Sequence, residues 1–257
     1  MTGGNARADE LRANLKAVRA RIAAACEAVG RSADDVTLIA VTKTFPASDV
    51  RLLVELGVTD IGENRDQEAA RKAAECADLD PGPRWHFVGQ LQVNKARSVV
   101  RYADVVHSVD RLRLVEVLGA RARAAGRVIT CLVQVDLDPE PDPGAERRPR
   151  GVPGGRPPGL VPRGGAPPGD VPRLAAAIAA EAGLTLGGVM AVAPLGTPPR
   201  PAFRRLAEVA RAVRAAHPDA TIISAGMTGD LEEAIAEGAT HVRVGTALLG
   251  GRRPLVR

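Results

Sequence analysis

Short runs of β-forming residues alternate with helical segments along most of this chain of 257 residues. The runs cover residues 36–42, 60–62, 86–89, 105–109, 128–135, 186–193, 220–225 and 241–245. Eight such units predict an α/β fold, a single-domain (β/α)8 TIM barrel, in which every strand returns to the parallel sheet through a helix. An open doubly wound sheet remains the alternative, because periodicity does not show whether a sheet closes.

The composition fits helices that pack around a parallel sheet. Hydrophobic residues make up 45% of the chain but aromatic residues only 2%, so the core must be built from Val, Leu, Ile and Ala. A chain of this length can form one domain, which we expect over residues 1–257. An amphipathic helix is expected over residues 6–29, ended by Gly30. Its apolar positions at helical spacing are Leu11, Leu15, Val18, Ile22 and Ala25.

One segment breaks the alternation. Residues 139–172 contain eleven of the chain's twenty prolines and eight of its glycines, interleaved with charged residues. Pro and Gly at this density prevent regular helix or strand. We expect a Pro/Gly/Arg-rich, disordered insertion at about residues 139–165, in the loop after the fifth strand. We interpret it as a tolerated surface insertion rather than a binding segment.

The composition also argues against several classes of function. The net charge of +5 is spread along the chain, with neither a Lys/Arg stripe nor aromatic residues to stack on bases, so no nucleic acid partner is expected. Cys26, Cys76 and Cys131 lie far apart without CxxC spacing, which disfavours a disulfide framework or a metal site. The polar N-terminus and the lack of a long apolar run predict no membrane association and a cytoplasmic location.

Lysine is a rare choice in this sequence. Only four lysines occur, and arginine supplies nearly all of the positive charge. Lys43, in the stretch AVTKTFP, follows the first predicted strand. It therefore falls at the carboxyl end of the barrel, where barrel enzymes carry their functional groups. The simpler alternative is a lysine that is salt-bridged at the barrel rim.

Two glycine-containing loops at the same end could bind an anion. After the seventh strand, SAGMTGDLEEAI places Ser224 and Gly226 before a helix, and after the eighth, VRVGTALLG places Gly245 and Thr246. Free N–H groups at helix starts attract anions, and loops seven and eight of such barrels often build a phosphate site. Ordinary helix capping is the alternative explanation for the first loop.

An amine and a phosphate site at one barrel mouth together describe a phosphorylated aldehyde held as an imine. Pyridoxal 5′-phosphate (PLP) fits that description. The lysine amine must be uncharged to attack the aldehyde. Arg243, on the same face of its strand as Gly245, could supply a neighbouring cation.

Five stretches in order, AVTKTFP, GENRDQEA, WHFVGQLQVNKAR, ISAGMTGDLEEAI and VRVGTALLG, resemble the pyridoxal phosphate homeostasis protein family, the YggS/PROSC group. The resemblance covers residues 6–138 and 170–250. It implies a barrel of the alanine racemase N-terminal type, the fold of fold-type III PLP proteins, with the cofactor as a Schiff base on Lys43. It also implies that the phosphate is surrounded by Ser224, Gly226, Gly245 and Thr246.

Three further positions match the family motifs. Arg243 matches the group that faces the pyridine nitrogen, and an arginine there would keep that nitrogen unprotonated. Asn64 and His86 match positions at the ends of strands two and three, and we predict that both belong to the cofactor site. Asn64 could equally cap the following helix, and His86 could be a core histidine. The remaining histidines are expected to be structural or exposed: His107, His217 and His241.

The chain departs from the family pattern after strand seven, where relatives more often read SMGMS followed by two acids. Here Ala225 replaces a methionine, Thr228 replaces a serine, and Gly229 intervenes before the acids. Thr228 keeps a hydroxyl, so anion binding is expected to survive. The short, glycine-containing basic segment that relatives have after strand five is expected to persist as RGGAPPGDV at residues 163–171.

The resemblance implies a PLP-binding protein that buffers the cofactor and delivers it to apo-enzymes, without turnover of its own. The alternative is a low-activity PLP-dependent amino-acid racemase, which needs a second acid/base group opposite the lysine. In barrel racemases this second group is a tyrosine that an additional β-domain supplies. The only tyrosine here, Tyr102, is expected on the helix before strand four, away from the mouth. A third reading is an interaction module without cofactor. We expect a monomer, because the β-domain commonly dimerises the racemases.

Overall fold

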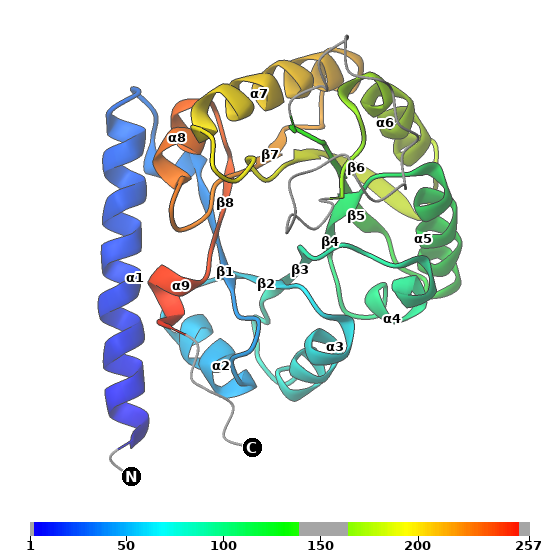
Figure 1. Cartoon of the computed structure of the whole chain (residues 1–257). Coiled ribbons are helices and arrows are strands. Elements are labelled where there is room, and N and C mark those ends of the chain that lie inside the picture. Colours follow the sequence, from blue (N-terminus) through cyan, green and yellow to red (C-terminus); the bar gives the residue numbers. More distant parts are fainter. Residues whose placement is uncertain (1–2, 139–163, 252–257) are drawn as a thin grey trace.

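Each predicted β-run forms a strand in the computed structural model, which describes residues 3–138 and 164–251 (Figure 1). The strands are β1 Thr37–Val41, β2 Asp60–Glu63, β3 Arg84–Phe87, β4 Val105–Val109, β5 Ile129–Gln134, β6 Leu184–Met190, β7 Ile222–Ser224 and β8 His241–Val244. Most bounds agree with the predicted runs to within two residues. The one larger difference is at the carboxyl end of β6, which stops three residues early.

The eight strands form a closed parallel barrel in sequence order. Closure comes from the pairing of β1 with β8, in which Thr37 lies opposite His241 and Ile39 opposite Arg243. The predicted TIM barrel is therefore confirmed, and the open doubly wound sheet is excluded. All eight carboxyl ends point to one mouth, because every neighbouring pair is parallel.

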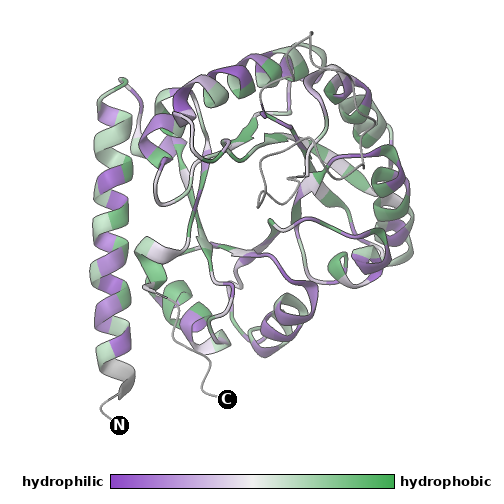
Figure 2. Cartoon of the chain, in the orientation of Figure 1, coloured by the Kyte–Doolittle hydropathy of each residue, from purple (hydrophilic) through white to green (hydrophobic). Residues whose placement is uncertain are grey.

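Helices surround the barrel (Figure 1). The α-helices are α1 Gly3–Glu27, α2 Ala47–Glu55, α3 Asp66–Glu75, α4 Ala96–Val99, α5 Leu112–Ala124, α6 Val171–Ala179, α7 Pro199–Ala216, α8 Leu231–Ala236 and α9 Thr246–Leu249. Short 3-10 helices cover Ala33–Asp35, Val93–Lys95 and Pro168–Asp170. Hydrophobic and hydrophilic residues alternate along these helices, as expected for elements with one face on a core (Figure 2). Within the described ranges, no helix is long and apolar enough to cross a bilayer.

The long helix α1 lies outside the barrel, beside α2, α8 and α9 (Figure 1). All five apolar positions predicted for its inner face are buried. Burial of a Leu, Val or Ile side chain contributes about 1.5–3 kcal/mol, so this face holds the helix in place. The helix ends at Glu27, two residues before the predicted end, and Gly30 completes the following turn with a φ of 68°, which suits a residue without a Cβ. The next N–H, of Arg31, donates to the carbonyl of Cys26 across 2.9 Å.

The two sides of the barrel wall differ in polarity. Residues that face outward, such as Ile61, Phe87 and Val106, belong to the two large hydrophobic clusters under the helices. Inside the barrel the third hydrophobic cluster holds only three buried residues: Val105, Leu132 and Met190. Buried polar side chains also come from the strands: Asp60, His86, His107, Ser224 and Arg243. The strand periodicity of two therefore produces an apolar outer core and a polar interior.

The predicted insertion lies almost wholly outside the described residues, which resume at Gly164. From there the chain runs beside the end of β5, where Ala166 forms a parallel bridge with Val135. The Gln134 side-chain amide donates to the carbonyl of Gly164. Residues 164–166, part of the segment expected to persist from relatives, thus return to the barrel mouth before α6.

Candidate functional site

Lys43 lies in a tight turn at the carboxyl end of β1. The N–H of Phe45 donates to the carbonyl of Thr42 across 3.0 Å and closes this turn. Thr44, directly after Lys43, has a φ of 71°, in the range of the third position of a type II turn. The Lys43 side chain is half-buried, and it forms no hydrogen bond or ion pair within residues 3–138 and 164–251. Its amine is therefore free to meet a ligand.

The loops after β7 and β8 lie against each other at the same mouth. The hydroxyl of Thr228 accepts a hydrogen bond from the N–H of Ala247, with an N to O distance of 3.4 Å. The carbonyl of Gly226 accepts from the N–H of Arg243 across 2.9 Å. The two segments predicted to surround a phosphate are therefore neighbours in space.

Other atoms approach two glycines of these loops closely, so that glycine is required at Gly226 and favoured at Gly245. Gly226 has a φ of 86°, and a Cβ there would lie 2.7 Å from the Cβ of Ala234. A Cβ on Gly245 would lie 3.3 Å from the carbonyl oxygen of Val41. The second approach brings the end of β8, where Thr246 begins α9, against the end of β1 that leads to Lys43.

Helix capping, the alternative explanation for this loop, does not take the predicted form: the N-cap of α8 is Asp230, and its side chain makes no capping hydrogen bond to the helix. The Asp230 carboxylate, just before α8, accepts a hydrogen bond of 2.6 Å from the N–H of Met227. This amide is consequently not available to an anion. A phosphate at this mouth must rely on other groups of the two loops, closer to Ser224 and Gly226.

Arg243 is buried inside the barrel on β8. Its guanidinium donates to Ser224 Oγ across 2.7 Å and to the carbonyl of Ala191 across 2.9 Å. Burial lowers the pKa of Arg243 to about 10, and the carboxylate of Asp230 acts in the opposite direction. The side chain still carries its charge at neutral pH. It therefore places a fixed cation below the barrel mouth.

A chain of hydrogen bonds leads from Ser224 across the barrel interior. Ser224 Oγ lies 3.0 Å from His107 Nδ1, His107 Nε2 lies 2.9 Å from His86 Nδ1, and His86 Nε2 lies 2.8 Å from Asp60 Oδ1. Arginine can only donate and a carboxylate can only accept, so the two ends fix the direction of the chain. Each histidine then donates towards Asp60, and the Ser224 hydroxyl donates to His107.

Both histidines of this hydrogen-bond chain, His86 and His107, are neutral. Burial lowers the pKa of His86, against the effect of Asp60, and lowers the pKa of His107 well below its ordinary value. Burial alone would raise the pKa of Asp60, but hydrogen bonds from His86 and Thr59 bring it below its usual value. The chain therefore joins one carboxylate to the guanidinium of Arg243 through neutral groups.

Asn64 lies at the carboxyl end of β2, on one side of the mouth. Its side-chain oxygen is buried and has no hydrogen-bond partner among the described residues. The loop packs against Gly89, where a Cβ would lie 2.9 Å from the Cα of Asn64. A cavity of ≈ 480 Å³ opens beside it and is lined in part by Arg65, Phe87 and Lys95. Of the predicted site residues only Asn64 lines this cavity.

The structure thus joins most of the predicted residues but not all. Ser224, Gly226 and Arg243 are linked by hydrogen bonds, and the loops with Gly245 and Thr246 adjoin the end of β1. His86 lies deeper, with both ring nitrogens already bonded, so it reaches the mouth only through its neighbours.

Sequence reasoning missed three buried polar residues of this region. His107 was expected to be structural or exposed, but it connects His86 to Ser224. Lys72 and Glu63 form a buried ion pair of 2.6 Å beside the β1 loop. The spacing of Glu68 and Lys72 on α3 was a usable signal, because side chains four residues apart lie on one helix face.

Tyr102, the only tyrosine, lies in the turn between α4 and β4 rather than on a helix. Its hydroxyl is buried and lacks a hydrogen-bond partner in the described part of the chain. Burial raises the pKa of Tyr102, and the nearby carboxylates of Asp66 and Glu63 raise it further. A buried phenol that resists ionisation is unsuited to acid/base work at the mouth.

Comparisons with known proteins agree with this geometry. The family described as "Alanine racemase, N-terminal domain" matches residues 8–253. A protein of Mycobacterium tuberculosis named "Pyridoxal phosphate homeostasis protein" is 42% identical over 261 aligned positions, which cover 96% of this chain and 95% of that protein. This chain belongs to the pyridoxal phosphate homeostasis protein family.

Solved structures place the family barrel in a wider group. PipY of Synechococcus elongatus, solved with PLP bound, is 32% identical, with a TM-score of 0.74 over 93% of this chain and 100% of PipY. An alanine racemase of Streptomyces coelicolor is 20% identical, with a TM-score of 0.65 over 94% of this chain but 58% of the racemase. The racemase likeness shows the fold alone, and the homeostasis protein barrel corresponds to only part of that enzyme.

Proposed function

We propose that this chain binds PLP at the barrel mouth through the amine of Lys43. The observation that carries the proposal is a half-buried lysine at the end of β1 that has no partner among the described residues. Nζ would attack the aldehyde carbon of PLP. A carbon–nitrogen double bond forms, the carbon–oxygen double bond breaks, and the oxygen leaves as water with both protons of the neutral amine. The name of the family and the PLP bound in PipY support this assignment.

The phosphate group would lie between the loops after β7 and β8. Gly226 and Gly245 allow the close approach of a ligand to the backbone, and Thr246 offers a hydroxyl and an N–H at the start of α9. Ser224 would contribute through its backbone, because its hydroxyl is engaged with His107 and Arg243 inside the barrel. Asn64, with its unpartnered oxygen, fits the opposite side of the cofactor.

When bound, PLP supplies an electrophilic aldehyde and a ring that can withdraw electrons. Arg243 would face the ring nitrogen from below. A guanidinium that stays charged at neutral pH disfavours protonation of that nitrogen, which weakens the ring as an electron sink. His86 and His107 would act behind Arg243 by fixing the position of Ser224.

We infer that the protein holds and delivers PLP rather than turning over an amino acid. This role needs an amine that binds reversibly but no second acid/base group, and Tyr102 is poorly suited to be that group. Delivery to apo-enzymes and a monomeric, single-domain chain in the cytoplasm belong to the same proposal. Three buried, free cysteines suit a reducing compartment.

Reduction of the PLP-loaded protein with borohydride tests the proposal. We expect one phosphopyridoxyl group on the peptide that contains Lys43, and none in the variant Lys43→Met. Lys16→Met, which removes an exposed lysine on α1, serves as the matched control and should keep the adduct. An adduct that persists in Lys43→Met would overturn the assignment of the amine.

Solvent deuterium exchange at the α-carbon of amino acids separates the carrier from the racemase. The PLP-loaded protein is expected to show exchange no faster than free PLP. Robust exchange that disappears in Lys43→Met would replace the carrier proposal with the racemase. Deletion of residues 139–163 is expected to leave PLP binding intact, since we assign this insertion no part in the site.

A further inference from the structure

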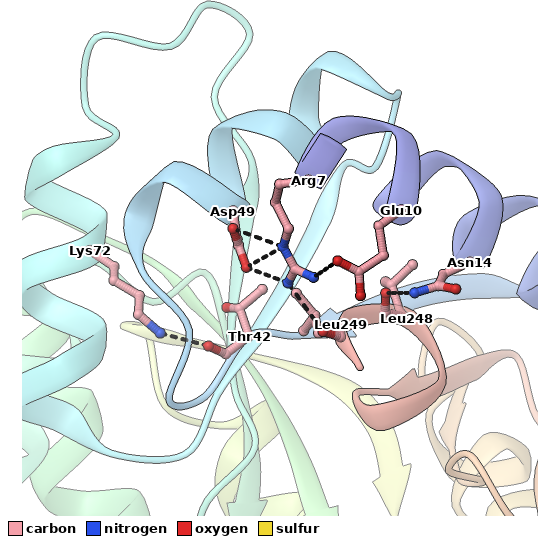
Figure 3. A network of polar contacts seen from close by, with 8 residues as sticks. All are labelled: Arg7, Glu10, Asn14, Thr42, Asp49, Lys72, Leu248 and Leu249. Atoms are coloured by element: carbon pink, nitrogen blue, oxygen red, sulfur yellow. Dashed lines mark hydrogen bonds and ion pairs between the residues drawn. The ribbon is translucent and has the colours of Figure 1, made fainter. Parts of the chain in front are cut away.

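Lys72 is the most completely bonded lysine of the described chain. It lies on α3, only 1% exposed, where an unpaired ammonium would be costly to bury. Its Nζ donates to the carbonyl of Thr42 across 2.7 Å, to Glu63 Oε1 across 2.6 Å and to Glu68 Oε1 across 2.7 Å. An ammonium has three donors, so none is left for a ligand. Figure 3 shows the side chain pointing at the loop that follows β1.

The bonds of this cluster reach both neighbours of Lys43. On the amino side, the carbonyl of Thr42 accepts from Lys72, and the Thr42 hydroxyl donates to Glu63 Oε1 across 2.6 Å. On the carboxyl side, the N–H of Thr44 donates to Glu68 Oε1, the oxygen that also accepts from Lys72, across 2.5 Å. The residues on either side of Lys43 are therefore tied to one buried ammonium.

The backbone at this place needs such support. Thr44 is the only residue other than glycine with a positive φ in the described ranges, and this conformation costs about 1–2 kcal/mol for an L-residue. Glu68 accepts the N–H of that strained residue, while Lys72 holds the carbonyl that closes the turn. The hydrogen bonds of the cluster therefore stabilise a turn whose positive φ at Thr44 is unfavourable for an L-residue.

We propose that Lys72, with Glu63 and Glu68, is a positioning residue that fixes the direction in which Lys43 projects into the barrel mouth. This inference rests on the proposed function of Lys43. Lys72 does not touch the ligand; it acts through the backbone of the β1 loop. A residue with a purely structural role would stabilise the fold without any separate effect on the reaction of the Lys43 amine.

Two measurements separate these roles. The first is the rate constant of imine formation with PLP, followed by absorbance. The second is the affinity for pyridoxine 5′-phosphate, which has the same phosphate and ring but no aldehyde. Loss of positioning should slow imine formation at least about tenfold, because a shift of about 1 Å in a reacting group can cost about a hundredfold. Affinity for the analogue should stay within about twofold, since the hydrogen bonds of Lys72 go to Thr42, Glu63 and Glu68 and to no residue of the β7 and β8 loops in the described ranges.

The variants are Lys72→Met and the pair Glu68→Ala and Glu68→Gln. Lys72→Met removes all three donors. Glu68 is partly exposed, so Glu68→Ala can fold even if Lys72→Met does not, and it removes the acceptor for the Thr44 N–H. Glu68→Gln keeps an oxygen acceptor and should form the imine at nearly the wild-type rate. Faster hydrogen exchange of the Thr44 amide in the apo forms of Lys72→Met and Glu68→Ala provides a readout without cofactor.

Wild-type rates of imine formation in both Lys72→Met and Glu68→Ala would overturn the proposal. A parallel loss of rate and analogue affinity would overturn it as well, because it indicates general damage to the mouth. If Lys72→Met does not fold, Glu68→Ala measured against Glu68→Gln decides alone. Failure of the proposed function is recognised separately, by an adduct that survives in Lys43→Met, and would leave Lys72 with no amine to position.

Discussion

Lys43 and Lys72 are two lysines that lie beside the same loop in opposite environments. Lys72 is buried, and its ammonium uses every donor in bonds to Thr42, Glu63 and Glu68. Lys43 is half-buried and has no partner within the described residues. The hydrogen bonds and ion pairs of each lysine, rather than residue type or burial alone, therefore decide which lysine is structural and which is free to react.

Glu63, the buried carboxylate that pairs with Lys72, is incompletely satisfied within the described residues. Burial raises the pKa of Glu63, and its second oxygen, Oε2, has no hydrogen-bond partner in the part of the chain that is described. The nearby ammonium and the Thr42 hydroxyl act in the opposite direction and favour the charged form. A buried pair with one incompletely satisfied partner adds little net stability, but removal of either member is costly. Such a pair suits a role in geometry better than a role in stability.

The largest expected effect is the contrast in stability between the two lysines. Lys72→Met should lower the free energy of unfolding by about 3–5 kcal/mol, because it leaves the buried carboxylate of Glu63 without its cation. Lys43→Met should change it by no more than about 0.5 kcal/mol, since no bond is lost. Urea unfolding of the apo proteins measures both. Equal losses in the two variants would show that the contacts of Lys72 do not set it apart.

The second expected effect tests the other half of the site. Gly226→Ala should lower the free energy of unfolding by about 2–4 kcal/mol, through a left-handed φ and a clash with Ala234, and should weaken binding of pyridoxine 5′-phosphate. Gly229→Ala is the matched control in the same loop, because a Cβ there meets no atom within 4 Å and its φ is not positive. Comparable damage from both substitutions would contradict the close approach at Gly226.

Burial keeps the histidines of the barrel neutral, in contrast to the ion-paired ammonium of Lys72. This difference predicts that the free energy of unfolding depends on pH. Burial lowers the pKa of His241 to about 4. The unfolded chain, with a histidine pKa of about 6.5, binds more protons between these values. Stability should therefore be constant above about pH 6.5 and fall as the pH decreases towards 4. His241→Gln should reduce the slope by up to about 1.4 kcal/mol per pH unit.

Urea unfolding of wild type and His241→Gln between pH 4.5 and 8 measures this slope. Both proteins keep His86 and His107, whose pKa values are also lowered by burial, so some pH dependence should remain in the variant. Indistinguishable slopes in the two proteins would contradict a neutral, half-buried His241.

Much of the barrel could be predicted from the sequence because strand and helix periods are local. The strand over residues 105–109 was predicted with its observed bounds, and all eight strands were found. Periodicity alone could not show that the barrel closes, since closure depends on the pairing of β1 with β8, whose partners lie about two hundred residues apart in the chain. The family resemblance supplied what periodicity did not.

The site was predictable only where a residue's position along its own strand carries the information. Lys43 follows a strand and must lie at the mouth. The bond of His107 to Ser224 spans 117 residues, and that of Lys72 to Thr42 spans 30, so neither could be read from spacing. The contacts of Lys72 form only when α3 packs against β2 and the side chain reaches the loop after β1.

The smallest expected effect concerns Arg7 on α1. From outside the barrel, Arg7 contacts both the helix after the Lys43 loop and the helix after Gly245 (Figure 3). Its guanidinium binds Asp49 of α2, at 2.6 Å from Oδ2, and the carbonyl of Leu249 at the end of α9, at 3.1 Å. Helix α2 follows the Lys43 loop, and α9 follows Gly245. Arg7 therefore ties together the elements behind the amine and behind the predicted phosphate loop.

Arg7→Met should cost about 1–2 kcal/mol, because it leaves the buried Asp49 carboxylate with an unmet hydrogen-bonding requirement. Arg12→Met is the matched control on the same helix: among the described residues Arg12 pairs only with exposed Asp9, and such pairs contribute about 0–1 kcal/mol. Urea unfolding at low and high salt should separate them, with the Arg7 effect persisting when exposed pairs are screened. If both substitutions cost the same and both effects vanish in salt, α1 adds only hydrophobic packing, and the two halves of the mouth are held by the barrel alone.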